Sequence, residues 1–308
     1  MKQTTYDDYW FHYIFSEDPQ EIKNSIKETY INSENIDIHI DIYGKELHTD
    51  KNIIFVHGTS VYSRFYAEFL YRLYKKEYRV FAPDLIGHGL SGGSRGHFTM
   101  KIFTRIIYDL TSYIRERFGN KIVVMGSSLG GITAFYCAAN DPRLNGAVCH
   151  NAAIFDEKAY KRIIDIKGIL KVLLPTVPLL ARVLPKLHLS VFLYLDFKEL
   201  AKDEDVLESI EYLLDDEFFT EKYSLIALTT QLKAPLARPV EDIETPIMII
   251  NGDNDYLFSV DYMREIYDRL TCKPKKLEII ENGSHLIFQE HIDEALDSII
   301  SWLEILFS

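Results

Sequence analysis

One pentapeptide in the sequence, Gly126-Ser127-Ser128-Leu129-Gly130, places a serine between two glycines. A short apolar run precedes it at residues 122–125, and small apolar residues with helical character follow it. A strand, a sharp turn and a helix in this order can hold the central serine as an exposed nucleophile, because only very small residues fit on either side of such a turn. We therefore expect Ser128 to attack an electrophilic carbon. Ser127 is the alternative by adjacency, but a side chain at its position is expected to point away from the substrate.

A serine hydroxyl is a poor nucleophile at neutral pH and needs a general base that a carboxylate holds in place. His285 follows the last short apolar run, residues 277–280, and precedes the final helical segment. This position at the end of a predicted strand favours His285 as the base. His291 lies a turn into the final helix and is expected to be exposed.

The orienting carboxylate should follow the preceding apolar run, residues 247–250, where two aspartates stand close together. Asp255 lies further into the loop, where it can reach across to the histidine, and is our prediction. Asp253 comes directly after a glycine and is expected to form the turn. Asp156, which follows another predicted strand, is a third candidate.

A developing oxyanion needs backbone N–H donors that point at it. The residue after the nucleophile, Leu129, should supply one donor. Thr59, in the loop after the apolar run 53–56, should supply the other. His57 in the same loop could be taken for a metal ligand or a second base. No partner ligands stand at a suitable spacing, so we interpret His57 as a loop-stabilising residue and expect neither a metal nor a cofactor.

Short apolar runs alternate with helical patterns along most of the chain. Runs without polar alternation, each followed by a helix, indicate a parallel sheet that is covered on both faces. Residues 36–43 do alternate, which predicts a half-buried strand with 24–31 as its hairpin partner. The other predicted strands are 53–56, 79–82, 122–125, 147–149, 247–250 and 277–280, and the predicted helices are 65–76, 102–118, 129–139, 261–270 and 292–306.

Residues 155–242 interrupt this rhythm with prolines and a dense acidic stretch. We interpret them as a mainly helical cap or lid inserted between two strands of a core that comprises residues 1–154 and 243–308. The aromatic-rich first 23 residues have no assigned place in this scheme.

Four blocks occur in an order that resembles the α/β-hydrolase superfamily: His57-Gly58, the segment 83–91, the turn at Ser128, and the pair Asp255 and His285. The resemblance runs from about residue 36 to the C-terminus, and it implies the α/β-hydrolase fold with the order Ser, Asp, His. Residues 87–97 are similar to the loop of the monoacylglycerol lipase and lysophospholipase-like branch. Ser127 departs from the pattern, since many relatives carry histidine there.

The resemblance implies a serine hydrolase that cleaves a lipid-like or aliphatic acyl ester through an acyl-enzyme. Apolar residues of the inserted segment would supply the acyl pocket. Thioesterase, peptidase and carbon–carbon hydrolase activities remain alternatives, since a fold does not fix a substrate. A non-catalytic ligand-binding protein is a further alternative. The residues expected to form the acyl pocket are Leu173, Leu174, Leu179, Leu180 and Val183.

Composition narrows the setting in which these residues act. The chain of 308 residues carries a net charge of −12, which weighs against nucleic-acid partners. Its 3 cysteines fit neither a disulfide framework nor a zinc site, and we expect a reducing cytoplasm.

The N-terminus shows no signal-peptide pattern, and prolines and charges interrupt the most apolar stretch, residues 169–195. We expect no transmembrane segment, although transient lipid contact is compatible with this pattern. The oligomeric state is left open.

Overall fold

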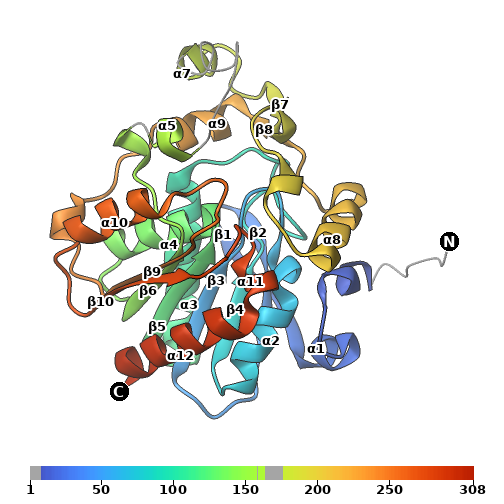
Figure 1. Ribbon diagram of the computed structural model, residues 1–308, viewed down its shortest axis with the longest axis vertical. Helices are drawn as coiled ribbons and strands as arrows, with labels where there is room; N and C mark the ends of the chain where they lie inside the picture. Colours follow the sequence, from blue (N-terminus) through green and yellow to red (C-terminus); the bar gives the residue numbers. More distant parts are fainter. Residues whose placement is uncertain (1–7, 158, 164–175) are drawn as a thin grey trace.

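Eight strands form one mixed sheet at the centre of the protein (Figure 1). The computed structural model describes residues 8–157, 159–163 and 176–308. In space the strands follow the order β1-β2-β4-β3-β5-β6-β9-β10. Strand β2 runs antiparallel to both of its neighbours, and the other pairs are parallel. The strands are β1 (Ile26–Ser33), β2 (Ile36–Tyr43), β3 (Lys51–Val56), β4 (Arg79–Pro83), β5 (Lys121–Ser127), β6 (Gly146–His150), β9 (Ile247–Gly252) and β10 (Lys275–Ile280).

The middle strands are buried along almost their whole length because helices cover both faces of the sheet. This explains why they appear in the sequence as continuous apolar runs rather than alternating patterns. The predicted strands are confirmed to within a few residues at each end. The hairpin partner begins later than expected, at Ile26, because Pro19–Ser25 forms the short helix α1, which Asp18 caps.

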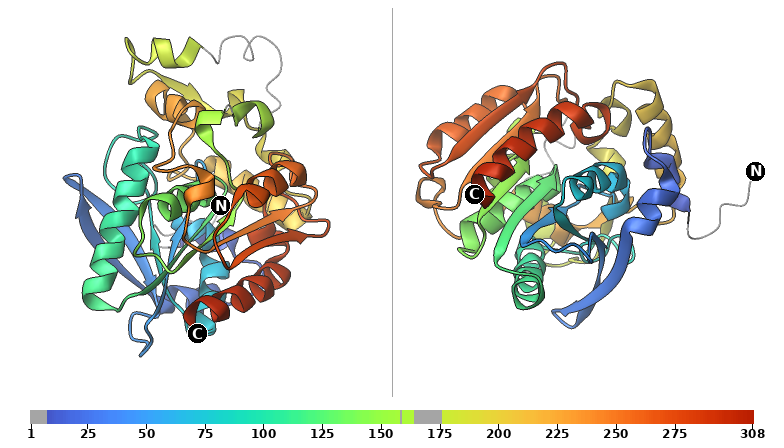
Figure 2. Two further views of the ribbon diagram at one scale, coloured as in Figure 1. Left: turned by 90° about the vertical axis from the view of Figure 1, so that its left-hand side faces the viewer. Right: turned by 90° about the horizontal axis from the view of Figure 1, so that it is seen from below.

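The order of the strands also determines which face each helix covers. The chain moves outward from β3 to β4 through one helix and back past β3 to β5 through the next, so right-handed crossovers place these helices on opposite faces. Helices α2 (Ala67–Lys75) and α12 (Ile292–Phe307) pack together on one face, and α3 (Met100–Arg117) and α4 (Leu129–Asn140) pack together on the other. Helix α10 (Val260–Arg269) connects β9 to β10, and Figure 2 shows helices on both sides of the sheet.

One predicted helix is divided in the structure. The sequence favoured a continuous helix over residues 65–76, but Ser63–Tyr66 forms a 3₁₀ turn, η2, before α2 begins at Ala67. All four side chains of η2 are buried, and η2 joins the loop after β3 directly to the start of α2.

The segment between β6 and β9 gathers above the carboxyl edge of the sheet (Figure 1). Its described part is not only helical, because β7 (His188–Ser190) and β8 (Lys222–Ser224) form an antiparallel pair that the sequence did not indicate. The helices and turns in the described part of this segment are η3 (Phe155–Glu157), α5 (Tyr160–Ile163), α7 (Val177–Leu180), η5 (Val191–Leu193), η6 (Phe197–Glu199), α8 (Glu204–Asp215), α9 (Leu225–Leu232) and η7 (Val240–Asp242).

The aromatic residues near the N-terminus pack between the core and this segment. The 3₁₀ turn η1 (Tyr9–Tyr13) buries Trp10 and Tyr13. The Tyr13 hydroxyl donates to Asp216 Oδ2 at 2.8 Å, and Tyr62 donates to the same carboxylate. The N-terminal aromatic residues therefore help to hold the end of α8 against the core.

No helix among the described residues has both the length and the apolar character that are needed to cross a membrane.

Candidate active site

Ser128 stands on a strained turn between β5 and α4. Its backbone angles are φ 55° and ψ −120°, in a region that residues other than glycine rarely adopt. Its backbone N–H donates to the carbonyl oxygen of His150 at 2.9 Å, which fixes the turn. A Cβ atom at Gly126 would overlap the backbone of Gly130, and one at Gly130 would overlap the carbonyl oxygen of Val56. Both glycines are therefore required by close approach of the backbone.

His285 and Asp255 meet across two neighbouring loops, one after β10 and one after β9. The Nδ1 atom of His285 lies 2.9 Å from Asp255 Oδ2, and both side chains are almost fully buried. The same carboxylate oxygen accepts a hydrogen bond from Asn151 Nδ2 at 3.0 Å. The other oxygen accepts from the backbone N–H groups of Leu257 at 2.8 Å and Phe258 at 3.0 Å. Every donor in this set favours an ionised carboxylate.

The surroundings of Asp255 keep it charged despite its burial. Burial alone would raise the pKa of this carboxyl group, but the charge and hydrogen bond of His285 outweigh that effect and lower the pKa below its ordinary value. An ionised Asp255 favours the tautomer of His285 with the proton on Nδ1. In that tautomer Nε2 is free to accept a proton from a hydroxyl group.

The loop after β3 is anchored to the inserted segment. Ser60 has a positive φ of 68°, which costs energy for a residue with a side chain. Its N–H donates to the Tyr223 hydroxyl at 2.7 Å, and its carbonyl oxygen accepts from the Thr220 N–H at 2.9 Å. Thr59, the predicted oxyanion donor, directly precedes Ser60 and lines the cavity described below.

The other predicted oxyanion donor and the loop histidine also have defined positions. Leu129 is the first residue of α4, where backbone N–H groups have no partner within the helix. His57 begins the loop after β3, where its Nε2 accepts from the Leu85 N–H at 3.0 Å and its Nδ1 contacts the Gly58 carbonyl oxygen at 2.9 Å. These contacts agree with a loop-stabilising role for His57.

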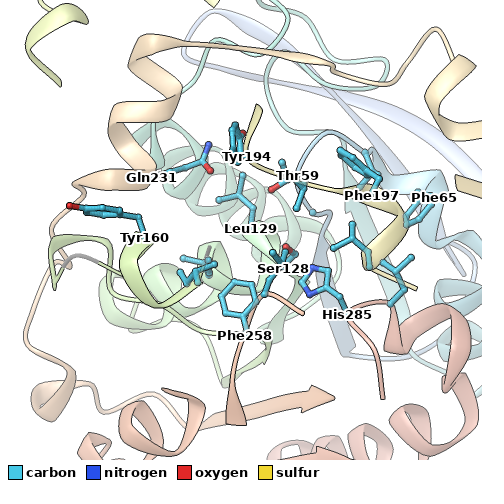
Figure 3. A pocket seen from close by; sticks show the side chains of 18 of the residues that line it. Thr59, Phe65, Ser128, Leu129, Tyr160, Tyr194, Phe197, Gln231, Phe258 and His285 are labelled. Carbon is cyan, nitrogen blue, oxygen red and sulfur yellow. The ribbon is translucent and has the colours of Figure 1, made fainter. Parts of the chain in front are cut away.

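Ser128 and His285 face a cavity that is partly open to solvent, with about 1100 Å³ of empty space when the open solvent at its mouth is included. Figure 3 shows the His285 ring beside Ser128, with Gln231, Tyr160 and Tyr194 farther along the wall. Most of the lining is aliphatic or aromatic, and it comes from both the core and the inserted segment. The apolar lining residues include Val61, Phe65, Ile132, Phe155, Ile163, Leu195, Phe197, Leu200, Ile210, Leu213, Leu228 and Leu257.

The prediction that the apolar run of the inserted segment lines this cavity is wrong for its described residues. Leu179, Leu180 and Val183 are exposed to 64%, 48% and 77%, because α7 and the turn after it project away from the core. Leu173 and Leu174 lie outside the described residues. The cavity wall comes instead from residues spread over α5, η6, α8 and α9, whose spacing in the sequence gives no joint pattern.

The alternative candidates lie apart from the cavity. Ser127 is buried at the end of β5 with its hydroxyl 2.9 Å from His150 Nδ1. Asp253 occupies the turn after β9, Asp156 is exposed on η3, and His291 lies half-buried between the last two helices. None of these side chains lines the cavity that contains Ser128.

Two groups of described side chains have donor atoms close enough to hold a metal. One comprises His150, Asp255 and His285. The other comprises Glu28, His39 and Asp41, but the Arg64 guanidinium donates to both carboxylates of that group. Since a cation already pairs with each acidic side chain of the second group, we propose no metal there.

Sequence reasoning missed three polar supports of the site: His150, Asn151 and Tyr223. His150 and Asn151 stand at the end of β6, where the apolar pattern predicted only a strand and a loop. Asn151 has a positive φ of 69°, a conformation that asparagine tolerates better than most residues. An asparagine directly after a buried strand was the available signal.

Comparisons with known proteins show the family and the fold of the chain. Residues 48–292 match the family model described as Serine aminopeptidase, S33. The chain is 21% identical to a monoacylglycerol lipase of Mycolicibacterium smegmatis over 82% of this chain and 87% of that protein. It is 24% identical to a monoglyceride lipase of Mus musculus over 85% of each chain. The solved structure of Paleococcus ferrophilus monoacylglycerol lipase matches with a TM-score of 0.73 at 23% identity, over 87% of this chain and 99% of that one.

Proposed function

Because the chain belongs to the serine aminopeptidase S33 family of α/β-hydrolases, we propose that it hydrolyses carboxylic esters through an acyl-enzyme on Ser128. The observation that carries the proposal is the placement of Ser128 and His285 on one apolar cavity, with Asp255 paired to His285 at 2.9 Å. Relatives named as monoacylglycerol and monoglyceride lipases support a substrate with a single aliphatic acyl chain.

In the first half of the reaction, Ser128 Oγ attacks the ester carbonyl carbon while His285 Nε2 takes the hydroxyl proton. The carbonyl oxygen becomes an oxyanion and accepts hydrogen bonds from the N–H groups of Thr59 and Leu129. Protonated His285 then gives its proton to the leaving alcohol, and the acyl group remains on Ser128. In the second half, His285 activates water, which attacks the acyl carbon and releases the acid.

The cavity wall favours an aliphatic acyl group. Burial of a methylene against such a wall contributes about 0.8 kcal/mol to binding, so each carbon of the chain strengthens binding until the cavity is full. We propose that residues 155–242 act as a cap that selects the acyl chain, since they contribute Leu195, Ile210 and Leu228 to the wall. The buried free cysteines Cys137, Cys149 and Cys272 support a reducing, cytoplasmic setting.

A peptide with a free amino terminus is a poorer match, although the family model carries the name of an aminopeptidase. An α-ammonium group in an apolar cavity needs an anionic partner, because an unpaired buried charge is costly. None of the described cavity-lining residues is aspartate or glutamate. Ester substrates need no such partner.

The test of the proposal is covalent labelling followed by turnover. Wild-type protein should react with a fluorophosphonate probe, and mass spectrometry should find the adduct on Ser128. The Ser128→Ala variant should not react, whereas Ser127→Ala should still be labelled on Ser128. Absence of labelling in folded wild-type protein, or an adduct on Ser127, would refute the assignment.

Turnover should then be measured on p-nitrophenyl esters and monoacylglycerols of increasing chain length. We expect kcat/KM to rise with chain length and to reach a plateau where the cavity is filled. Aminoacyl p-nitroanilides serve as the peptidase comparison, and faster turnover of those compounds would contradict the ester proposal.

A further inference from the structure

A second histidine, His150, lies directly behind the proposed base. Its side chain is fully buried, and it stands at the carboxyl end of β6, next to the end of β5. The ring centroids of His150 and His285 are 5.4 Å apart, with the planes inclined by 42°. The Phe258 ring also stacks nearly parallel to the His285 ring, with a centroid distance of 5.8 Å and an angle of 10°. The base is thus packed against two aromatic rings.

His150 is anchored at several points. Its Nδ1 lies 2.9 Å from Ser127 Oγ, and its ring packs against Phe288 with a centroid distance of 5.1 Å. Its carbonyl oxygen also accepts the N–H of Ser128, so one residue touches both the nucleophile turn and the base. Ser127 in turn hydrogen-bonds to Tyr66, whose hydroxyl is also bonded to the backbone of Gly58 in the oxyanion loop.

These contacts form a buried hydrogen-bond network that runs from the proposed oxyanion loop, residues 57–60, through Tyr66 and Ser127 to His150. The network ends beside His285, and a ring nitrogen of His150 lies within 4.8 Å of donor atoms of Asp255 and His285. The three parts of the proposed active site, namely oxyanion loop, nucleophile turn and base, therefore share one internal support.

Ser127 and His150 carry a hydroxyl and an imidazole, the groups of a nucleophile and its base, but they lack access to the cavity. Neither residue lines the cavity, and both side chains are buried. Burial, together with the nearby charge of His285, lowers the pKa of His150 to about 3, so its imidazole remains neutral and weakly basic. A neutral ring at this position also avoids repulsion when His285 becomes positively charged during the reaction.

We propose that His150 is a positioning residue: held by Ser127, it forms the surface against which the His285 ring rests, so that Nε2 stays aligned with Ser128. This inference rests on the proposed function, because it assigns His285 as the base. A ring that is free to tilt would spend less time in the reactive alignment, and a misplacement of about 1 Å can cost roughly 100-fold in rate. The effect therefore belongs to kcat and not to binding of the acyl chain.

The test uses His150→Phe, Ser127→Ala and the double variant. Phenylalanine keeps an aromatic ring at position 150 but cannot bond to Ser127, and alanine at position 127 removes the anchor without changing the ring. We expect each single variant to lose roughly 10- to 100-fold in kcat with KM changed less than about twofold. If Ser127 acts through His150, the double variant should be no slower than the slower single variant.

Thr111→Val is the matched control, since it removes another buried hydroxyl, bonded at 2.8 Å to the Ile107 carbonyl oxygen within α3, away from the cavity. Its kcat should equal that of the wild type. The thermal unfolding midpoint of each variant shows whether it is folded, and if His150→Phe does not fold, Ser127→Ala alone decides.

Three outcomes would each overturn the role of His150. The kcat of both single variants could stay within about twofold of wild type, the loss could be confined to KM, or the two losses could multiply in the double variant. An inert wild type that does not react with the fluorophosphonate probe would instead overturn the proposed function itself.

Discussion

Replacing Asp255 with asparagine should slow ester hydrolysis by about four orders of magnitude, the cost of the same change in the best-studied serine protease. Asp255 accepts hydrogen bonds at both oxygens: Leu257 and Phe258 donate to one, and Asn151 and His285 meet the other. An asparagine side chain has only one acceptor oxygen. If that oxygen faces the backbone N–H groups, the amide NH₂ faces His285 and requires its Nδ1 to be unprotonated.

The consequence is the wrong tautomer of the base. With Nδ1 unprotonated, the proton sits on Nε2, and the nitrogen that takes the Ser128 proton in the proposed mechanism can no longer accept it. A loss of about 10⁴ in kcat corresponds to about 5.4 kcal/mol of transition-state stabilisation. Folding should change little, because the side chains have nearly the same size and the two backbone donors keep their acceptor.

The assay is kcat for a p-nitrophenyl ester, with the thermal unfolding midpoint as the control for folding. Asp253→Asn and Asp156→Asn serve as matched variants, since Asp253 occupies a turn and Asp156 is exposed. Both should keep activity within about tenfold of the wild type, because neither touches the base. An Asp255→Asn variant with near-normal kcat, together with a collapse in either control, would show that the acid has been misassigned.

Three further substitutions probe the supports of the site. Gly130→Ala should destabilise the fold by about 2–4 kcal/mol in denaturant unfolding, because the new methyl group would overlap backbone carbonyl oxygens at the end of β3; wild-type stability would contradict this. Tyr223→Phe removes the hydroxyl that accepts the Ser60 N–H, and kcat should fall roughly 10-fold with KM unchanged, less than for loss of an oxyanion donor itself. Burial would lower the pKa of His39, but hydrogen bonds and charges, with Asp84 first, outweigh it and raise the pKa to about 10. Its contribution to stability is therefore fully present below pH 6.5 and is lost as the pH rises to about 10, so unfolding midpoints should fall over this range and fall less steeply in His39→Gln.

Much of the core could be predicted from local patterns. Apolar runs marked the central strands because both faces of the sheet are covered, and paired glycines marked the turn at Ser128 because its backbone approaches β3 closely. The choice between Asp253 and Asp255 rested only on reach across a loop, and spacing alone cannot show which carboxylate points toward the histidine.

The remaining features depend on contacts between residues that are far apart in the chain. Tyr13 finds its hydrogen-bond partner Asp216 about two hundred positions later, so the aromatic N-terminus carried no local sign of its place. His150 had the pattern of an ordinary core residue because its partners come from other parts of the chain: Ser127 from the end of β5 and His285 from the loop after β10. The cavity wall was predicted wrongly because an apolar run can face solvent when the segment that carries it projects from the core.

The hydrogen bonds between Ser60 and the inserted segment bear on how this protein could be recombined with its relatives. Exchanging all of residues 155–242 for the corresponding segment of another hydrolase would also remove Thr220 and Tyr223, which hold Ser60, and Asp216, which holds Tyr62. Such a chimera would gain a new cavity wall and lose the hydrogen bonds that hold its own loop after β3. For grafting, residues 216–224 should be kept together with the core. The exchanged segment should therefore end before residue 216.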